Sequence, residues 1–225
     1  MDMNEICLKY SFKDFTIDAT ISLKESEIVA LFGDSGSGKS TILRLLAGLL
    51  GDGILPKNEL AFLFQDCTLF SNFNVYENLL YSNTKTLFDD LKIIFSRSKA
   101  NEYYDELLNL AGLSDKKFAN LKTLSGGEKQ RLALICALSK KAKYILLDEP
   151  LSALDDTNKI ALINLIKKIN STYKCTIILV SHSCFEIYSL ASRVYMIHNG
   201  KTIKCLNRQE FYNEKIKNNE LICKI

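Results

Sequence analysis

The order of apolar and polar residues along the chain predicts β-strands of two kinds. Residues 15–23 alternate between apolar and polar side chains, and this period of two is typical of a strand with one solvated face, most often an antiparallel one. Residues 28–32 are instead apolar throughout and end at Gly33, which predicts a strand buried on both faces. Similar apolar runs recur at 145–147 and 177–180.

Helical patterns lie between these strands. Apolar residues recur with the period of an amphipathic helix at 42–49 and again at 162–169. Near the end of the chain, Asn199-Gly200 stands between two short apolar runs and predicts a β-hairpin. Buried strands that alternate with amphipathic helices indicate an α/β fold, with a mainly parallel sheet and an antiparallel β part.

The stretch from about 71 to 124 differs from the rest of the chain. It is rich in Asn, Ser, Lys and Tyr, contains no buried-strand run, and has helical propensity from 87 to 113. We interpret it as a helical sub-domain inserted into a single domain that spans residues 1–225. The charged stretch 208–219 is expected to form a surface helix.

The composition is that of a globular protein and argues against several other classes. The chain has 225 residues, 47% of them hydrophobic and 24% charged, as in a globular domain. The net charge of +3 is too small to argue for nucleic acid or an anionic membrane surface. No apolar run approaches the roughly 18 residues of a membrane span, and the start does not resemble a signal peptide. Seven cysteines without a Cys-x-x-Cys pair indicate reduced thiols in the cytosol.

A phosphate-loop pattern, G-x-x-x-x-G-K-S, follows the first buried strand. It consists of Gly33, Asp34, Ser35, Gly36, Ser37, Gly38, Lys39 and Ser40. Glycines let the backbone wrap a phosphate, and the helix that begins near Lys39 directs its positive end at the anion. In such a loop the lysine supplies a charge for the β- and γ-phosphates, and the serine supplies a hydroxyl for Mg²⁺. The alternative is a plain glycine-rich turn.

Two carboxylates, Asp148 and Glu149, follow the apolar run 145–147. A carboxylate at a strand tip in a nucleotide-binding fold can hold Mg²⁺, and a second one can act as general base on water. The alternative is an acidic strand end that faces solvent. The neighbouring phosphate loop favours the catalytic interpretation.

Residues 124–131 contain a helix start with an unusual composition. Ser125 and Glu128 form the S-x-x-E pattern of a capping box. A cap does not need Gly126 and Gly127, which lower helix propensity at this position. Both glycines suit a helix N-terminus that closely approaches an anion.

Residues 124–131 resemble the signature sequence of the ATP-binding cassette (ABC) ATPases. The phosphate loop, the strand end 148–150, the segment 151–155 and His182 follow in the order of that family. The resemblance runs from about residue 10 to residue 201. It implies a P-loop NTPase fold of the ABC type, with ATP and Mg²⁺ as ligands.

The resemblance implies roles for individual residues. The loop from Gly33 to Thr41 would bind the phosphates, with Lys39 as the cationic clamp. Mg²⁺ and the attacking water would be organised by Ser40, Gln65 and Asp148. Glu149 would be the general base, assisted by Gln65, and His182 would contact the γ-phosphate.

The resemblance also implies a dimer that encloses two ATP molecules. The signature of one chain would contact the ATP bound to the other through Ser125, Gly126 and Gly127. Asp155 would lie at the interface between the two chains. In relatives an aromatic side chain upstream of the phosphate loop stacks on adenine. Tyr10 is our choice for this position and Phe12 is the competitor, while either ring could belong to the core.

The chain has one cassette, no heptad run and no fused membrane domain. It therefore resembles the separate ATPase subunit of a bacterial transporter, in the cytoplasm on the inner face of the cell membrane. The expected partners are integral membrane permease subunits, a second copy of the chain and, indirectly, a substrate-binding protein, without nucleic acid. The alternatives are another transport or envelope complex, or a soluble mechanochemical module. The aromatic segment 69–76 would discriminate between a transport subunit and a soluble module, because in relatives this segment receives a helix of the membrane subunit. The competing interpretation of its aromatic residues is local core packing.

A finer resemblance connects the chain to molybdate importer ATPases, with sulfate and tungstate importers close behind. The stretches that carry it are 30–33, 64–70, 75–81 and 180–194. It predicts import of an oxyanion such as molybdate. The chain departs from these relatives at three places. Asp34 stands where they often have Pro, and Ser26 stands where Gly is usual. The span 54–60 is short, which predicts a trimmed antiparallel sub-domain. We expect no regulatory C-terminal β-barrel, because only 25 residues follow Gly200.

Overall fold

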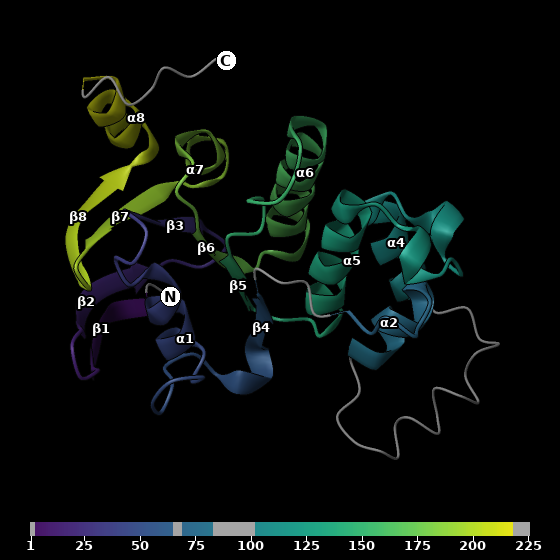
Figure 1. Ribbon diagram of the computed structural model, residues 1–225, viewed down its shortest axis with the longest axis horizontal. Coiled ribbons are helices and arrows are strands. Elements are labelled where there is room, and N and C mark those ends of the chain that lie inside the picture. The colour runs from purple at the N-terminus through teal and green to yellow at the C-terminus, as the bar shows by residue number, and fades with distance from the viewer. Residues whose placement is uncertain (1–2, 65–68, 83–101, 218–225) are drawn as a thin grey trace.

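The computed structural model describes residues 3–64, 69–82 and 102–217. In this part of the chain, one sheet of eight strands has the order β1-β2-β8-β7-β3-β6-β5-β4 (Figure 1). The strands are β1 (Met3–Ser11), β2 (Thr16–Leu23), β3 (Ile28–Phe32), β4 (Leu60–Leu63), β5 (Tyr144–Asp148), β6 (Thr176–Val180), β7 (Arg193–His198) and β8 (Lys201–Asn207).

The centre of the sheet is parallel and one end of it is antiparallel. Strands β4, β5, β6, β3 and β7 pair in parallel, whereas β1–β2 and β7–β8 pair antiparallel. Strand β8 meets β2 in parallel at the pair Asp18–Lys201. This arrangement confirms the predicted α/β fold with a mainly parallel core and an antiparallel part, and β7–β8 is the hairpin predicted at Asn199-Gly200.

Helices cover both faces of the sheet, which explains the apolar runs that do not alternate. The helices are α1 (Lys39–Leu46), α2 (Val75–Ser82), α4 (Glu102–Ala111), α5 (Gly126–Ser139), α6 (Asp156–Tyr173), α7 (Cys184–Leu190) and α8 (Arg208–Lys217). In β3, Ile28 and Ala30 belong to the core with α5 and α6, whereas Val29 and Leu31 belong to the core with α1. Because both faces are covered, β3 needs apolar residues at successive positions.

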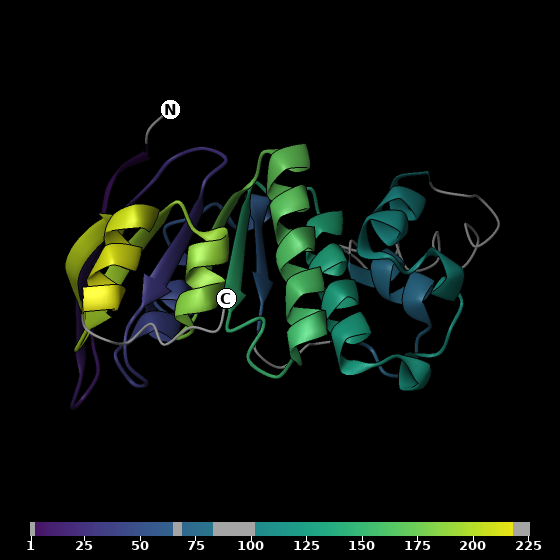
Figure 2. The ribbon, with the colours of Figure 1, turned by 90° about the horizontal axis from the view of Figure 1, so that it is seen from above.

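Helices α2 and α4 pack against α5 at the far end from β1 (Figure 2). Leu79 of α2 and Leu107 of α4 are fully buried there, and Tyr76 donates a backbone hydrogen bond to the carbonyl of Lys117, at 2.9 Å. Helices α2 and α4 both lie within the predicted sub-domain, 71–124. That sub-domain stays a prediction as a unit, because much of the stretch predicted to be helical, 87–101, lies outside the described residues.

Helix α8 is more than the surface helix expected from its charged sequence. Phe211 is 1% exposed, and its ring lies edge-on to Phe32, with the ring centroids 5.1 Å apart. Lys215 is also buried, with Nζ 4.4 Å from the centre of the Phe32 ring. The expected surface helix is confirmed over Arg208–Lys217, and the structure adds that one large aromatic, Phe211, anchors its inward face on the core beside β3.

The described residues also bear on the predictions about membrane spans and cysteines. None of their helices combines the length and the apolar character that crossing a bilayer requires. Their cysteines carry free thiols, at positions 7, 136, 175, 184 and 205.

Replacement of Phe211 by Ala tests the anchoring of α8. Removal of a buried phenylalanine ring costs about 3–5 kcal/mol, so we expect F211A to lower the free energy of unfolding by this amount in urea titrations. Ile216 lies on the same helix and is 46% exposed, so I216A should change it by less than about 0.5 kcal/mol. Equal effects of the two substitutions would contradict the anchoring role.

Candidate nucleotide site

The predicted phosphate loop connects the end of β3 to the start of α1. Gly38 caps α1 with φ of 101°, a conformation that residues with a Cβ rarely adopt. A Cβ at this position would also lie 2.7 Å from Ile17 and 3.2 Å from the ring of Phe15. Glycine is therefore required here by backbone conformation and by space.

The β7–β8 hairpin supports the loop from behind. The Gly200 N–H donates to the Ser37 carbonyl at 2.9 Å, and the Gly200 carbonyl accepts from Asp18 N–H at 2.9 Å. A Cβ on Gly33 would lie 2.1 Å from the carbonyl oxygen of Ile197. The sequence pattern predicted only a hairpin turn at Asn199-Gly200, and the structure adds that this turn fixes the backbone of the phosphate loop.

Lys39 lies inside the loop and is 5% exposed. Its Nζ donates to the carbonyls of Gly33 and Asp34 at 2.8 and 2.7 Å, and lies 3.4 Å from Ser37 Oγ. Burial lowers the pKa of Lys39, while the negative charges of Glu149, Asp34 and Asp148 oppose this shift. The loop thus holds an amine whose hydrogen bonds go to the loop's own oxygens.

Ser40, in the first turn of α1, contacts Asp148, the last residue of β5. Ser40 Oγ donates to Asp148 Oδ1 at 2.7 Å, and Asp148 is 5% exposed. A hydroxyl oxygen and a carboxylate oxygen at this separation fit the preference of Mg²⁺ for hard oxygen ligands. Gln65, the third residue assigned to the metal and water, lies outside the described residues.

Glu149 has an unusual backbone conformation at the tip of β5. Its φ of 47° lies in the left-handed region, which costs on the order of 1 kcal/mol for a residue with a Cβ. Its N–H donates to the carbonyl of Val180 at 3.1 Å, which holds the chain in this conformation. Its Oε1 lies 3.6 Å from His182 Nδ1, so the structure brings these two predicted site residues together.

The turn that carries His182 is held by a buried carboxylate, Glu186, for which the sequence pattern predicted no role. Glu186 is 4% exposed and accepts a hydrogen bond from Ser181 Oγ at 2.7 Å. Lys159 Nζ from α6 lies 3.8 Å from the other carboxylate oxygen of Glu186. These contacts fix the turn after β6 from which His182 projects. The contact with α6 bridges 27 residues along the sequence, so no local pattern could have indicated it.

The capping box predicted before α5 is confirmed. Glu128 N–H donates to Ser125 Oγ at 3.3 Å, and Ser125 N–H donates to Glu128 Oε2 at 2.9 Å. A hydrogen bond from Lys116 at 2.5 Å holds the pKa of Glu128 below its usual value. The cap leaves Gly126 exposed, and a Cβ there would meet nothing within 4 Å.

Asp155 caps α6 with its side chain. Its carboxylate accepts from the Asn158 N–H at 2.9 Å and from Asn158 Nδ2 at 2.7 Å, and these hydrogen bonds lower the pKa of Asp155. Because Asp155 is exposed, its hydrogen-bonded carboxylate is available for a contact outside its own chain.

The predicted site residues fall into two groups. The loop, Asp148, Glu149 and His182 lie together at one edge of the sheet. The hydrogen bonds of Ser125 instead stay at the start of α5, and strands β4 and β5 lie between α1 and α5 in Figure 1. One chain therefore presents the two groups on separate elements.

The adenine position stays open between the two aromatic candidates. Tyr10 is partly buried and Phe12 is 42% exposed, and their ring centroids lie 4.9 Å apart in an edge-to-face arrangement. Tyr10 also approaches Gly51 beyond the end of α1. Phe15 was predicted only as a strand residue, but a Cβ at Gly38 would lie 3.2 Å from its ring, so this aromatic side chain lies close to the phosphate loop.

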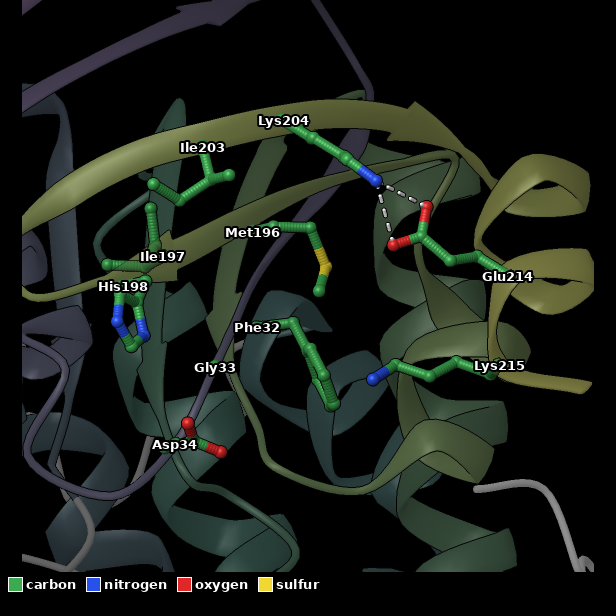
Figure 3. Close-up of a pocket in the computed structure, with 10 residues that line it drawn as sticks. All are labelled: Phe32, Gly33, Asp34, Met196, Ile197, His198, Ile203, Lys204, Glu214 and Lys215. Atoms are coloured by element: carbon green, nitrogen blue, oxygen red, sulfur yellow. Dashed lines mark hydrogen bonds and ion pairs between the residues drawn. The ribbon is translucent and has the colours of Figure 1, made fainter. Parts of the chain in front are cut away.

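A hollow of about 510 Å³ lies beside the start of the loop (Figure 3). Gly33 and Asp34 form part of its wall, and Lys204 and Glu214 form an ion pair at 3.1 Å on the other side. Helix α8 contributes Lys215. The hollow therefore separates the phosphate loop from α8.

Part of the aromatic segment 69–76 is exposed, as a partner site would require. Phe70 is 55% exposed, whereas Val75 and Tyr76 are buried. The Phe73 ring stacks on Tyr81 with the centroids 4.3 Å apart. The segment thus combines local core packing, at Val75 and Tyr76, with an exposed aromatic side chain at Phe70, and its use as a partner site stays a prediction.

Comparisons with known proteins agree with this geometry. Residues 17–152 match the family model described as ABC transporter. The chain is 35% identical over 207 residues to the molybdenum import ATP-binding protein ModC of Rhodopseudomonas palustris (strain HaA2), which covers 84% of the chain and 53% of the relative. It is 30% identical over 224 residues to the phosphonates import ATP-binding protein PhnC of Fusobacterium nucleatum, which covers 89% and 90%. The chain therefore spans about half the length of the ModC relative.

Other relatives and solved structures extend the comparison. Proteins of similar identity are named for import of aliphatic sulfonates, in Paracoccus denitrificans, and of methionine, in Legionella pneumophila. Among solved structures, cbiO1 from Clostridium perfringens superposes with a TM-score of 0.79 at 23% identity, over 99% of the chain and 96% of cbiO1. At that identity the likeness shows the fold alone.

Substitution of Lys39 tests the phosphate loop. Hydrogen bonds to a charged partner contribute about 1.5–3 kcal/mol, so we expect K39A to weaken ATP binding about 10–100-fold in titrations with a fluorescent ATP analogue. Lys167 is an exposed lysine of α6, and K167A should leave the affinity unchanged. An unchanged affinity in K39A would rule out the phosphate-loop interpretation.

Proposed function

Because the chain belongs to the ABC transporter family, we propose that it is the ATP-hydrolysing subunit of an importer. In this proposal it couples ATP binding and hydrolysis to movement of separate membrane subunits. The observation that carries the proposal is the convergence of Lys39, the Ser40–Asp148 pair and the Glu149–His182 pair at one edge of the sheet. An amine, oxygen ligands and a carboxylate base are the groups that phosphoryl transfer to water requires.

The residues divide the chemistry between them. Lys39 would shift its hydrogen bonds from the loop carbonyls to the β- and γ-phosphate oxygens of ATP. Ser40 and Asp148, with Gln65, would hold Mg²⁺, which when bound supplies positive charge to the phosphate oxygens. Glu149 would accept the proton of the attacking water. His182, 3.6 Å from Glu149, would donate to the γ-phosphate and hold it in line with that water.

A second copy of the chain would complete the site. Ser125, Gly126 and Asp155 are exposed and lie apart from the phosphate loop of their own chain, which supports a role toward the ATP of a partner copy. The start of α5 would present its N–H groups and positive dipole end to the γ-phosphate. Two ATP molecules would then join the two copies.

The membrane partner would dock on the exposed aromatic surface around Phe70. This surface lies next to a hollow of about 190 Å³ that Leu69, Leu121 and Lys129 help to line. Exposed aromatic side chains are common at protein interfaces. We therefore place the chain on the inner face of the cell membrane, bound to permease subunits and indirectly to a substrate-binding protein.

The proposed cargo is an oxyanion such as molybdate. The finer sequence resemblance and the relatives named for molybdenum and phosphonates support this class. A relative named for aliphatic sulfonates, which are also oxyanions, supports the same class, and a relative named for methionine defines the alternative cargo. A soluble module that acts on a macromolecule is the alternative outside transport, and it would not need the aromatic surface around Phe70.

Substitution of Glu149 tests the proposed function. A general base contributes about 10²–10⁴-fold to a rate, so we expect E149Q to lower steady-state ATP turnover by this factor while ATP affinity is retained. Because ATP is not consumed, E149Q should also accumulate as an ATP-bound dimer in light scattering. The assay uses the chain purified with its membrane partners, and E102Q, on the exposed start of α4, serves as the control. Turnover of E149Q within a few-fold of the unsubstituted chain would refute the assignment.

A further inference from the structure

The two glycines at the start of α5 have different surroundings. A Cβ at Gly126 would meet nothing within 4 Å, so this side of the helix start is open. A Cβ at Gly127 would lie 2.0 Å from Oδ1, 2.3 Å from Cγ and 2.8 Å from Cβ of Asn158. Gly127 is buried and its φ is not in the left-handed region. The three atoms nearest to an added Cβ all belong to Asn158, so a side chain at Gly127 would collide with Asn158.

Asn158 is held in place by contacts with two neighbours. Its Nδ2 donates to Asp155 Oδ2 at 2.7 Å, and its N–H donates to Asp155 Oδ1 at 2.9 Å. Its Oδ1 accepts from Arg131 at 3.4 Å, and Arg131 also donates from Nε to the carbonyl of Ala111 at 3.0 Å. The side-chain amide cannot rotate away from Gly127 without the loss of its hydrogen bonds to Asp155 Oδ2 and Arg131.

These contacts connect elements that lie far apart in the sequence. Arg131 and Gly127 belong to α5, Ala111 ends α4, and Asn158 lies in the first turn of α6. A second connection runs from Gln130 Nε2 to the carbonyl of Pro150 at 2.6 Å. Side-chain hydrogen bonds thus connect α5 to the loop after β5, through Gln130, and to the start of α6, through Asn158.

We propose that Asn158 is a positioning residue that sets the spacing between the start of α5 and the Asp155 loop, and that Gly127 must be glycine because Asn158 fills the space beside it. The proposal rests on the proposed function where it concerns ATP, since Ser125 and Asp155 would then meet the partner copy as one rigid surface. Within the described residues, the hydrogen bonds of Asn158 go to Asp155 and Arg131, not to the phosphate loop or the Glu149–His182 pair. Its effect would pass through Gly127 and Asp155.

A double-mutant cycle tests the proposal in the E149Q background. The four chains are the parent, G127A, N158G and the double variant G127A/N158G. Two readouts are taken: thermal unfolding without ATP, and the dissociation constant of the ATP-bound dimer by light scattering. The unfolding temperature reports the clash between residues 127 and 158 inside one chain. The dissociation constant reports the effect of that clash on the interface between two copies.

We expect G127A alone to lower the unfolding temperature by about 3–9 °C, as overpacking of a filled site does in a chain of this size. The same substitution should weaken the ATP-bound dimer at least about tenfold, a typical size for coupling between neighbouring residues. In the N158G background, G127A should leave the unfolding temperature unchanged or raise it, because alanine is the better helix former. Its effect on dimerisation should fall below about twofold.

The control substitution is G126A, whose added Cβ has open space around it. It should not lower the unfolding temperature in either background. Equal losses from G127A with and without Asn158 would overturn the proposal. So would a rescue of the unfolding temperature without rescue of the dimer, because Gly127 would then be required by the nucleotide itself. If the parent fails to dimerise with ATP, the proposed function fails, and the unfolding temperatures alone still decide whether Asn158 excludes a side chain at Gly127.

Discussion

The alignment of three buried parallel strands determines where the phosphate loop, the Asp148–Glu149 tip and His182 lie. Leu31 of β3 pairs with Val180 of β6, and Val180 pairs with Asp148 of β5. Because these strands end in line, the phosphate loop, the Asp148–Glu149 tip and the turn before His182 emerge at one edge of the sheet. Buried charge at this edge is accommodated by hydrogen bonds: in the part of the chain that the structure describes, every buried side-chain nitrogen and oxygen has a partner. A slip of one strand would separate the groups and leave such atoms unpaired.

The parts of the fold that could be predicted are those with a local signal. Strands buried on both faces give unbroken apolar runs, as in β3, and a helix start with Ser125 and Glu128 gives a capping box. The phosphate loop and the Asp148–Glu149 tip were also found from the sequence, since their residue types and order are fixed by the chemistry. Ser26, noted as a departure from the usual glycine, has φ of 59°, which explains in backbone terms why glycine is usual there. The role of Gln65 stays a prediction.

The parts that could not be predicted depend on contacts between distant segments. Strand β1 has buried residues at Ile6 and Leu8, but so short an alternation does not stand out from its surroundings. The anchor of α8 is a single aromatic, Phe211, in a charged segment, and one apolar residue shows no period. Asn158 and Gly200 are ordinary residues of a helix and a turn in the sequence, and only their neighbours in space reveal their function. Long-range packing, rather than propensity, is what the sequence analysis missed.

The central claim is that each nucleotide site is completed by a second copy of the chain. It is tested most directly by mixing two variants of the E149Q chain, one with K39A and one with S125R. Each variant alone should fail to trap labelled ATP in a particle of dimer mass, because each lacks one half of every site. A mixed dimer would contain one site in which the intact phosphate loop of one copy faces the intact Ser125 of the other. The account predicts that the mixture traps labelled ATP in a dimer, and a mixture as inactive as its separate components would contradict it.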